Sequence, residues 1–586
     1  MSLEPNRSTS ANPITDNLDL WSSATQKKAT VGRGKNGKTS PHGINKLREL
    51  ILELAVRGKL VPQDPNDEPA SVLLEKIAGE RLRLVTEKKI KKPKKFPPIS
   101  VKDKPFSLPD SWEFVRLNDL GEWGAGATPS RRHPEYYGGS IPWFKSGELI
   151  SDFISDSEEH VTELALKASS LRYNSKGDVL IAMYGATIGK TAILDVPATT
   201  NQAVCACTPF SGFSNVFLLL LLKAYKRRFI GMGAGGAQPN ISREKIIATV
   251  IALPPTAEQH RIVAKVDELM ALCDQLEQQQ TDSLQAHQTL VRVFLDRLVD
   301  QANTSQPFHT ELIDAFDTLF TTEESIDQLK QTILQLAVMG KLVPQNPNDE
   351  PASVLLEKIA AEKERLIKDK KIKKQKPLPP ISDEEKPFEL PAGWEFSRLQ
   401  NSIDVRDGTH DSPQDAPGGN SYPLVTSKNF IDGEIDFEAA RMISEEDHIE
   451  ISKRSLVEVD DILFSMIGGN IGNQVIVKDS RPFSVKNVAL FKYYSRAATL
   501  PTYFKLYTEE LAIELQHKAS GGAQPFVSLG SLRRLIFALP PLKEQHRIVA
   551  KTDELMTLCD TLKARLNEAE TTQAQLADAV VEQAIQ

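Results

Sequence analysis

The sequence has little of what marks secreted, membrane-spanning or metal-dependent proteins. Its 586 residues include four cysteines, too few for a disulfide scaffold, and the pair Cys205 and Cys207 offers too few ligands for a zinc site. The other two, Cys273 and Cys559, lie at equivalent positions in apolar helical patterns and are predicted to be core thiols. The first forty residues are polar without a secretory signal, and the longest apolar run, Val216–Leu222, is far below the ~20 residues that span a bilayer. We therefore expect a soluble, cytoplasmic protein in a reducing compartment, with no membrane partner.

A strongly basic character and recognisable catalytic motifs are also lacking. The formal net charge of −7 excludes a uniformly basic nucleic-acid-binding surface but is compatible with local basic faces. No HExxH, no GxSxG and no adenine-methyltransferase (Asp/Asn/Ser)-Pro-Pro-(Tyr/Phe) motif occurs. The nearest approach is GATIGKT at Gly185–Thr191, one residue short of a P-loop because Tyr184 stands where the first glycine belongs. These absences favour a binding protein over an enzyme, and we predict no catalytic residue, no metal site and no cofactor bound by this chain.

What the sequence does have is a long internal duplication. The segment Lys59–Glu80 (KLVPQDPNDEPASVLLEKIAGE) recurs at Lys341–Glu362 with two changes in 22 positions. The offset of 282 residues then holds without a gap to Trp112 and Trp394, in LPDSWEF and LPAGWEF. A second shared block, offset by 286 residues, contains GGAQP and then LPPxxEQHRIVAKxDELMxLCD. Between the shared blocks the two copies diverge, which indicates one scaffold that carries two different inserts.

The duplication also rules out the nucleotide-binding interpretation of the glycine turn. The second copy has GGNIGNQ at Gly468–Gln474, where Asn473 replaces the lysine that a P-loop requires. A turn that both copies keep, without the lysine, is a structural turn whose side chains vary.

Each copy is predicted to contain a helix, a Lys/Pro-rich linker, a variable α/β domain and a long helix. In the first long helix apolar residues step by 4, 3, 3 and 4 from Ile262 to Leu276, and Ile548, Thr552, Leu555, Leu558 and Leu562 repeat the spacing in the second, a coiled-coil-like seam. The first of these helices is expected to continue to about Asp300. The lysine-rich linkers are either basic arms for a nucleic-acid backbone or, the interpretation we favour, solvated helix ends and stiff linkers. The expected boundaries are 1–42 for a disordered N-terminal tail, 43–105 for the N-terminal helical repeat and Lys/Pro linker, 106–252 for the first variable domain, 253–387 for the central constant helices and linker, 388–538 for the second variable domain, and 539–586 for the C-terminal constant helix.

The residues that differ between the variable domains are polar and of a size that suits the edges of bases. Alignment on the shared Pro142 and Pro423 sets Lys145 against Thr426, and Ser130–His133 is matched with Arg406–His410. Surface loops are polar in any protein, so no single residue decides the matter, but the whole set favours recognition of DNA bases and phosphates. The predicted DNA-binding residues are Arg131, Arg132, Lys145, Ser146, Thr187, Lys190, Asn201, Gln202 and Gln238 in the first copy, and Arg406, Thr409, His410, Ser427, Lys428, Asn470, Asn473, Lys486, Asn487 and Gln524 in the second.

The shared blocks closely resemble the specificity subunit of type I restriction–modification systems, and the long amino-terminal repeat resembles the EcoAI-like (type IB) branch. The resemblance covers nearly everything from about residue 43 onward. It implies an α+β protein in which two α/β target-recognition domains are separated by long antiparallel coiled-coil-like helices, a pseudo-two-fold tandem repeat. Each domain would recognise one half of an asymmetric, bipartite site on double-stranded DNA.

The resemblance further implies a non-catalytic subunit with two kinds of partner. Two methylation subunits would carry S-adenosylmethionine and methylate adenine, and two restriction subunits would use ATP and Mg²⁺ to translocate and cut DNA. Two alternatives remain open at this point: a nuclease or methyltransferase in its own right, or a structural coiled-coil adaptor with degenerate inserts.

Overall fold

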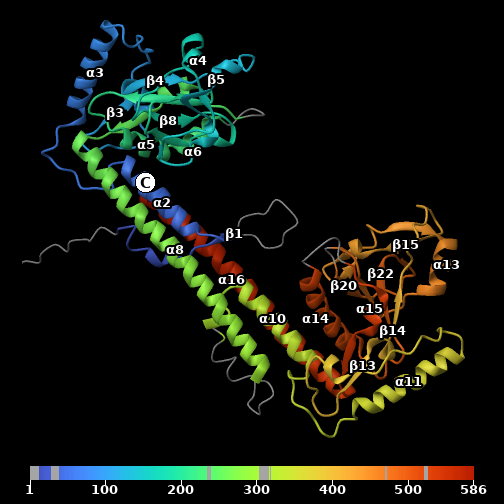
Figure 1. Cartoon of the computed structure of the whole chain (residues 1–586). Coiled ribbons are helices and arrows are strands. Elements are labelled where there is room, and N and C mark those ends of the chain that lie inside the picture. The colour runs from blue at the N-terminus through green and yellow to red at the C-terminus, as the bar shows by residue number, and fades with distance from the viewer. Residues whose placement is uncertain are drawn as a thin grey trace, which may run out of the picture. The chain divides into compact units, whose positions relative to one another are not determined.

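The computed structural model describes residues 12–27, 39–233, 239–301, 316, 318–416, 418–468, 471–519 and 526–585 (Figure 1). The chain divides into two compact units, unit 1 with residues 1–283 and 569–586, and unit 2 with residues 284–568. Each unit combines a mixed α/β variable domain with helices of the shared blocks, so the predicted α+β class is confirmed.

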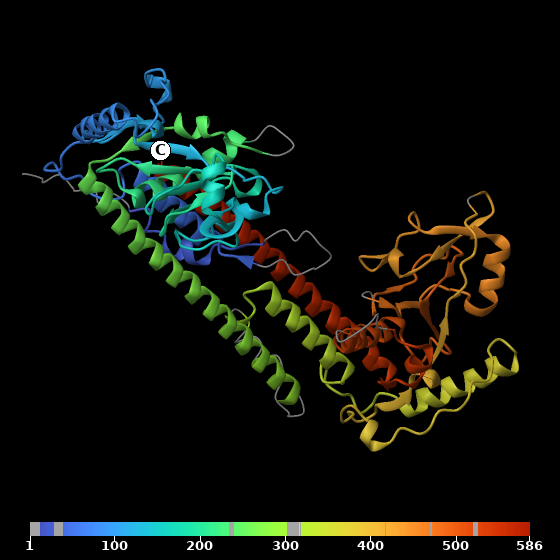
Figure 2. The ribbon, with the colours of Figure 1, turned by 45° about the horizontal axis from the view of Figure 1, so that its top comes forward.

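Three helical segments form the frame of unit 1. They are α2 (His42–Val56), the first part of α8 (Thr256–Gln301) and the last part of α16 (Leu542–Ile585), which lie side by side in Figures 1 and 2. Their apolar faces meet in one core, because leucines and isoleucines at helical spacing on α2 face α8 and α16. At the border of this core Arg48 pairs with Asp274 at 2.6 Å and with Glu277 at 2.8 Å.

Unit 2 repeats this frame with the roles of the long helices exchanged. Here α10 (Glu323–Val338) packs against the first part of α16 and the last part of α8. Lys330 pairs with Asp560, at the repeat positions of Arg48 and Asp274. The start of α8 and the end of α16 therefore belong to unit 1, whereas the end of α8 and the start of α16 belong to unit 2.

The predicted seam of the long helices is confirmed at most positions and is wrong at one. Ile262, Val266 and their repeat equivalents are buried, whereas Leu272 is 47% exposed and its equivalent Leu558 is 54% exposed. The neighbouring Cys273 and Cys559 are buried instead. The helical period of 3.6 residues carries a regular 4-3-3-4 pattern off the buried face, so the contact passes to the cysteine.

A second constant helix in each copy leads into the Lys/Pro linker. These helices are α3 (Ala70–Thr86) and α11 (Ala352–Lys368). Side-chain amides at equivalent positions hold the linkers against the variable domains: Asn118 donates to the Lys94 carbonyl at 3.2 Å and Gln400 to the Lys376 carbonyl at 2.9 Å.

The first variable domain is built from two sheets joined to the frame by a strand pair. Its sheets have the orders β4-β11-β8-β9-β6 and β10-β5-β7, and β3 pairs with β12. The apolar run that follows Asp178 forms the central strand β8, which is buried along its whole length. The strands are β3 (Glu113–Arg116), β4 (Gly121–Ala125), β5 (Tyr137–Phe144), β6 (Phe153–Ile154), β7 (His160–Val161), β8 (Val179–Ala182), β9 (Thr191–Leu194), β10 (Thr199–Thr200), β11 (Val204–Pro209) and β12 (Val250–Leu253), and the helices are α4 (Glu163–Ala168), α5 (Asn215–Ala224), α6 (Lys226–Gly233) and α7 (Arg243–Ile247).

The second variable domain repeats this plan with a smaller central sheet. Its sheets have the orders β14-β22-β19-β20 and β18-β15-β21, β16 pairs with β17, and β13 pairs with β23 next to the frame. The strands are β13 (Glu395–Arg398), β14 (Ile403–Asp407), β15 (Ser421–Val425), β16 (Phe430–Ile431), β17 (Glu434–Ile435), β18 (Arg441–Ser444), β19 (Ile462–Ser465), β20 (Gln474–Ile476), β21 (Ser484–Val485), β22 (Val488–Tyr493) and β23 (Ile536–Leu539), and the helices are α12 (Leu399–Ser402), α13 (Glu445–Ser455), α14 (Pro501–Ala519) and α15 (Leu529–Arg534).

Part of the expected disordered tail is folded, and the prediction is wrong there. Helix α1 (Leu18–Ser23) and the short pair β1 (Gln26–Lys27) with β2 (Thr39–Ser40) precede α2. Trp21 is fully buried in the core of unit 1, and its indole nitrogen donates to the Ile14 carbonyl at 3.1 Å. Burial of one large aromatic side chain orders a segment whose average composition is polar.

The four cysteines should not react with alkylating reagents in the folded protein. All four are buried free thiols, and burial raises the pKa of Cys205 to about 12 and that of Cys559 to about 11. Since the thiolate is the nucleophile, we expect no labelling by iodoacetamide at about pH 8 in buffer and full labelling in urea. Mass spectrometry of the intact chain measures both, and rapid native labelling of any cysteine would contradict the burial described here.

Candidate nucleic-acid interface

In each variable domain two parallel strands end together and present the predicted residues. Strand β5 pairs with β10 in the register Phe144 to Thr200, and the Asn201 amide donates to the Phe144 carbonyl at 3.0 Å. The residues after the two strands, Lys145 with Ser146 and Asn201 with Gln202, therefore emerge at one edge. We call this the strand edge of the first domain.

The second domain has the same edge in the same register. Strand β15 pairs with β21 from Val425 to Val485, and the Lys486 amide donates to the Val425 carbonyl at 2.9 Å. The predicted correspondence of Lys145 with Thr426 is thus confirmed, and the same register makes Lys486 the counterpart of Asn201. A 3-10 turn follows β5 and β15 in each copy, Ser146–Glu148 and Ser427–Asn429, and it holds Ser427 and Lys428 at the edge.

A third segment approaches each edge through a glycine. A Cβ atom on Gly126 would lie 2.2 Å from the Thr200 carbonyl oxygen, and one on Gly408 would lie 2.3 Å from the Val485 carbonyl oxygen. Only glycine fits so close to the backbone of the neighbouring strand. These two glycines keep the offset of 282, a signal that the sequence alignment could have used.

The equivalence of these two glycines corrects one predicted correspondence and identifies a further residue at the strand edge of the first domain. Because Gly126 is equivalent to Gly408, Thr128 is the counterpart of His410, rather than Ser130–His133 matching Arg406–His410. Thr128, which the sequence prediction missed, donates its hydroxyl hydrogen to the Gln202 side chain. His410 contacts the equivalent Asn487 at 3.2 Å.

Further predicted residues join the edge of the first domain. Arg131 and Lys145 both bind the carboxylate of Glu159, at 2.8 and 2.6 Å. The hydrogen bond from Lys145 lowers the pKa of Glu159, with a further contribution from Arg131, and the same bond raises the pKa of Lys145. From the glycine turn after β8, the Lys190 ammonium donates to the Gly147 carbonyl at 3.3 Å, and Thr187 lies in the same turn.

The edge of the second domain is organised by a different carboxylate. Asp407, at the end of β14, binds His410 at 3.0 Å and also pairs with Arg454. The Lys486 ammonium donates to the Ser412 hydroxyl, and the backbone of Lys486 forms an isolated parallel β-bridge with that of Thr409. Asn473 repeats the role of Lys190, because its side-chain amide donates to the Phe430 carbonyl, beside the 3-10 turn, at 3.4 Å.

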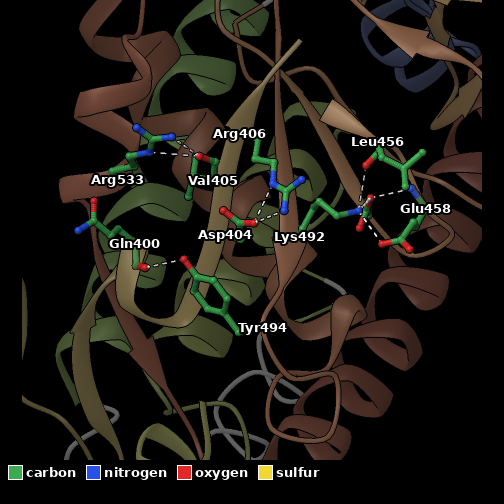
Figure 3. Close-up of polar contacts among 10 residues, drawn as sticks. Gln400, Asp404, Val405, Arg406, Leu456, Glu458, Lys492, Tyr494 and Arg533 are labelled. Atoms are coloured by element: carbon green, nitrogen blue, oxygen red, sulfur yellow. Dashed lines mark hydrogen bonds and ion pairs between the residues drawn. The ribbon is translucent and has the colours of Figure 1, made fainter. Parts of the chain in front are cut away.

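The structure does not bring the predicted residue Arg406 to the edge. Its guanidinium is held by Asp404 at 2.7 Å and faces the network around Lys492 (Figure 3). Successive side chains of a strand point to opposite faces, so Arg406 faces away from Asp407 and His410. Arg132 lies exposed beside Arg131. Gln238, Asn470 and Gln524, with most of both GGAQP segments, lie outside the described residues.

The described residues show neither a metal-binding cluster nor a membrane segment. They gather no group of three or more His, Cys, Asp or Glu that could hold a metal ion. No helix among them is long and apolar enough to cross a bilayer. What both edges offer is a set of amide, hydroxyl and cationic groups in the segments that follow the paired strands, which is chemistry for hydrogen bonding to bases and phosphates.

Two equivalent edges with different side chains, on one duplicated helical frame, define a sequence-recognition protein with two target-recognition domains. The chain belongs to the specificity subunits of type I restriction–modification systems: the family model "Type I restriction modification DNA specificity domain" matches residues 109–286 and 391–571. It is 40% identical to the EcoAI specificity subunit of Escherichia coli, over 98% of this chain and 99% of that protein. It is 38% identical to the E. coli EcoEI specificity subunit, with the same coverage.

The solved structures that match this chain are more distant in sequence. The HsdS subunit from Thermoanaerobacter tengcongensis is 18% identical, with a TM-score of 0.39 over 83% of this chain and 99% of that one. A chain from a structure of the complex assembly of a type I system is 18% identical, with a TM-score of 0.44 over 82% of this chain and 99% of its own.

Proposed function

We propose that this chain is the non-catalytic subunit that selects the DNA site of a type I restriction–modification complex. Each target-recognition domain reads one half of an asymmetric, bipartite site on double-stranded DNA. The observation that carries this proposal is the pair of strand edges, whose backbone register is equal and whose side chains differ. Two different half-sites require side chains that lie at equivalent positions but offer different hydrogen-bonding groups.

The constant frame supports the proposed partners. Because unit 1 and unit 2 repeat the same helices and ion-pair positions, a partner that docks on one unit finds an equivalent surface on the other. We therefore propose two methylation subunits, which bind S-adenosylmethionine, and two restriction subunits, which use ATP and Mg²⁺. The antiparallel helices α8 and α16 set the spacer between the half-sites, and the complex acts on DNA in the cytoplasm.

Replacing one domain tests the proposal. We expect that exchanging residues 117–249, between β3 and β12, for the matching segment of a relative will change one half of the methylated motif and leave the other half as it was. The readout is the adenine-methylation motif of host DNA, determined by long-read sequencing with the methylation subunit co-expressed. A change in both halves, or in neither, would refute independent recognition.

The enzyme alternative has a direct control. Purified chain alone is expected to show no turnover of DNA with S-adenosylmethionine or with Mg²⁺ and ATP. Turnover that a point substitution in this chain abolishes would overturn the non-catalytic assignment.

A further inference from the structure

The loop that carries Arg131 is fixed by two aromatic side chains. The Tyr137 hydroxyl donates to the Pro129 carbonyl at 2.6 Å, and the Trp143 indole nitrogen donates to the Ala127 carbonyl at 3.0 Å. Trp143 is itself buried, in a small apolar cluster of the first domain. Two hydrogen bonds from rings on β5 thus tie the backbone of this surface loop to the strand at Ala127 and Pro129.

The same two rings and one carboxylate fix the direction of the guanidinium. Arg131 lies 4.2 Å from the centre of the Tyr137 ring and 5.5 Å from that of Trp143. Its Nη2 binds Glu159 at 2.8 Å, yet the side chain remains 58% exposed. A guanidinium has five N–H donors in a plane, so one bond to Glu159 leaves several that point to solvent.

The position of Arg131 is within the strand edge rather than beside it. Glu159 binds Lys145 as well as Arg131, and Thr128 of the same loop bonds Gln202. The guanidinium therefore lies among the groups that the proposed function assigns to DNA. The second domain does not repeat this arrangement, because Leu424 occupies the position of Trp143 there. A feature that only one copy has belongs to what that copy alone recognises.

We propose that Arg131 recognises a guanine in the half-site of the first target-recognition domain, with Glu159, Tyr137 and Trp143 as positioning residues. This inference rests on the proposed function. A planar guanidinium held in one direction matches the O6 and N7 acceptors that guanine presents in the major groove, and an adenine at that place would oppose a donor to a donor. A carboxylate that fixes one end of the guanidinium reduces the side-chain entropy lost when the other end binds.

The methylated motif tests this assignment. The half-site that changes when residues 117–249 are exchanged should contain a G·C pair in the wild-type complex, and a half-site without one would overturn the inference. In the complex with Arg131→Ala, one guanine of that half-site should become degenerate. Discrimination at that position should fall about 5- to 150-fold, the range for one bidentate contact. The other half-site should keep its motif.

The neighbouring arginine supplies the matched control. Arg132→Ala removes the same charge from the same loop. A loss of methylation that both variants share therefore reports the missing charge, whereas a relaxed guanine preference in Arg131→Ala alone reports recognition of the base. Relaxation in Arg132→Ala with an intact motif in Arg131→Ala would overturn the assignment while leaving the proposed function standing. A purely structural role for Arg131 predicts less methylation at every site with the motif unchanged, which would also overturn it.

Discussion

The Trp394→Ala variant is expected to lose about 3–5 kcal/mol of the stability of unit 2, the range for truncating a buried tryptophan. Trp394 is 4% exposed and packs against Tyr503, and its indole nitrogen donates to the Glu544 carboxylate at 3.0 Å. Glu544 is buried, and burial raises its pKa. The substitution therefore opens a cavity and also removes a donor from a buried carboxylate. Urea unfolding followed by circular dichroism measures the loss.

The duplication provides a matched variant in the other unit. Trp112 donates to Glu258 at 2.9 Å in unit 1, so Trp112→Ala should weaken unit 1 by a similar amount and leave the transition of unit 2 in place. Trp394→Phe keeps most of the volume and should cost less than Trp394→Ala. A loss below about 1 kcal/mol in both alanine variants would mean that these tryptophans are not part of the frame.

The second large effect is expected at the buried ion pair of the second domain. The Lys492 ammonium donates to Asp461 at 2.6 Å, to Glu458 at 2.8 Å and to the Leu456 carbonyl at 3.1 Å (Figure 3). Lys492→Met keeps the volume but leaves Asp461, whose side chain is 2% exposed, without its cation. We expect a loss of about 3–5 kcal/mol at neutral pH, because one partner of a buried pair is left uncompensated.

The loss should depend on pH in a defined direction. Burial raises the pKa of Asp461 from 3.8 to about 6, although Lys492 opposes the rise. A carboxyl group with a raised folded-state pKa stabilises the fold fully below the unfolded pKa, and this contribution disappears as the pH rises through the folded value. Without Lys492 the folded pKa rises further, so the loss should be smaller at about pH 5 than at about pH 7.5. The double variant Lys492→Met with Asp461→Asn should recover most of the stability, and an equal loss in both variants would contradict this explanation.

The frame could be predicted because helical periodicity and an ungapped repeat are local properties of the sequence. The correspondence of Lys145 with Thr426 also followed from the shared proline that precedes them. The face of a strand to which a polar side chain points could not be predicted from the sequence. Arg131 and Arg406 look alike in the sequence, but Arg131 lies on aromatic rings at the edge while Arg406 belongs to the network around Asp404. That difference depends on strand alternation and on partners distant in the chain.

Two other misses have the same origin in long-range packing. Trp21 lies in a polar segment, and only the core of unit 1 explains why that segment folds. Thr128 faces Gln202 because a strand pair many residues later brings them together. Local composition does not report contacts between residues distant in the chain, so neither contact could be predicted from it.

The strand pairs at the root of each domain have a consequence for how such genes change. In the first copy, Glu113–Arg116 pairs with Val250–Leu253, and in the second, Glu395–Arg398 pairs with Ile536–Leu539. The chain thus leaves the frame and returns to it at adjacent points, so an inserted domain of any internal length closes on the same two strands. Recombination with breakpoints in the codons for these strands would transfer an entire recognition domain between lineages without disturbing the helices, and one event would supply a new target.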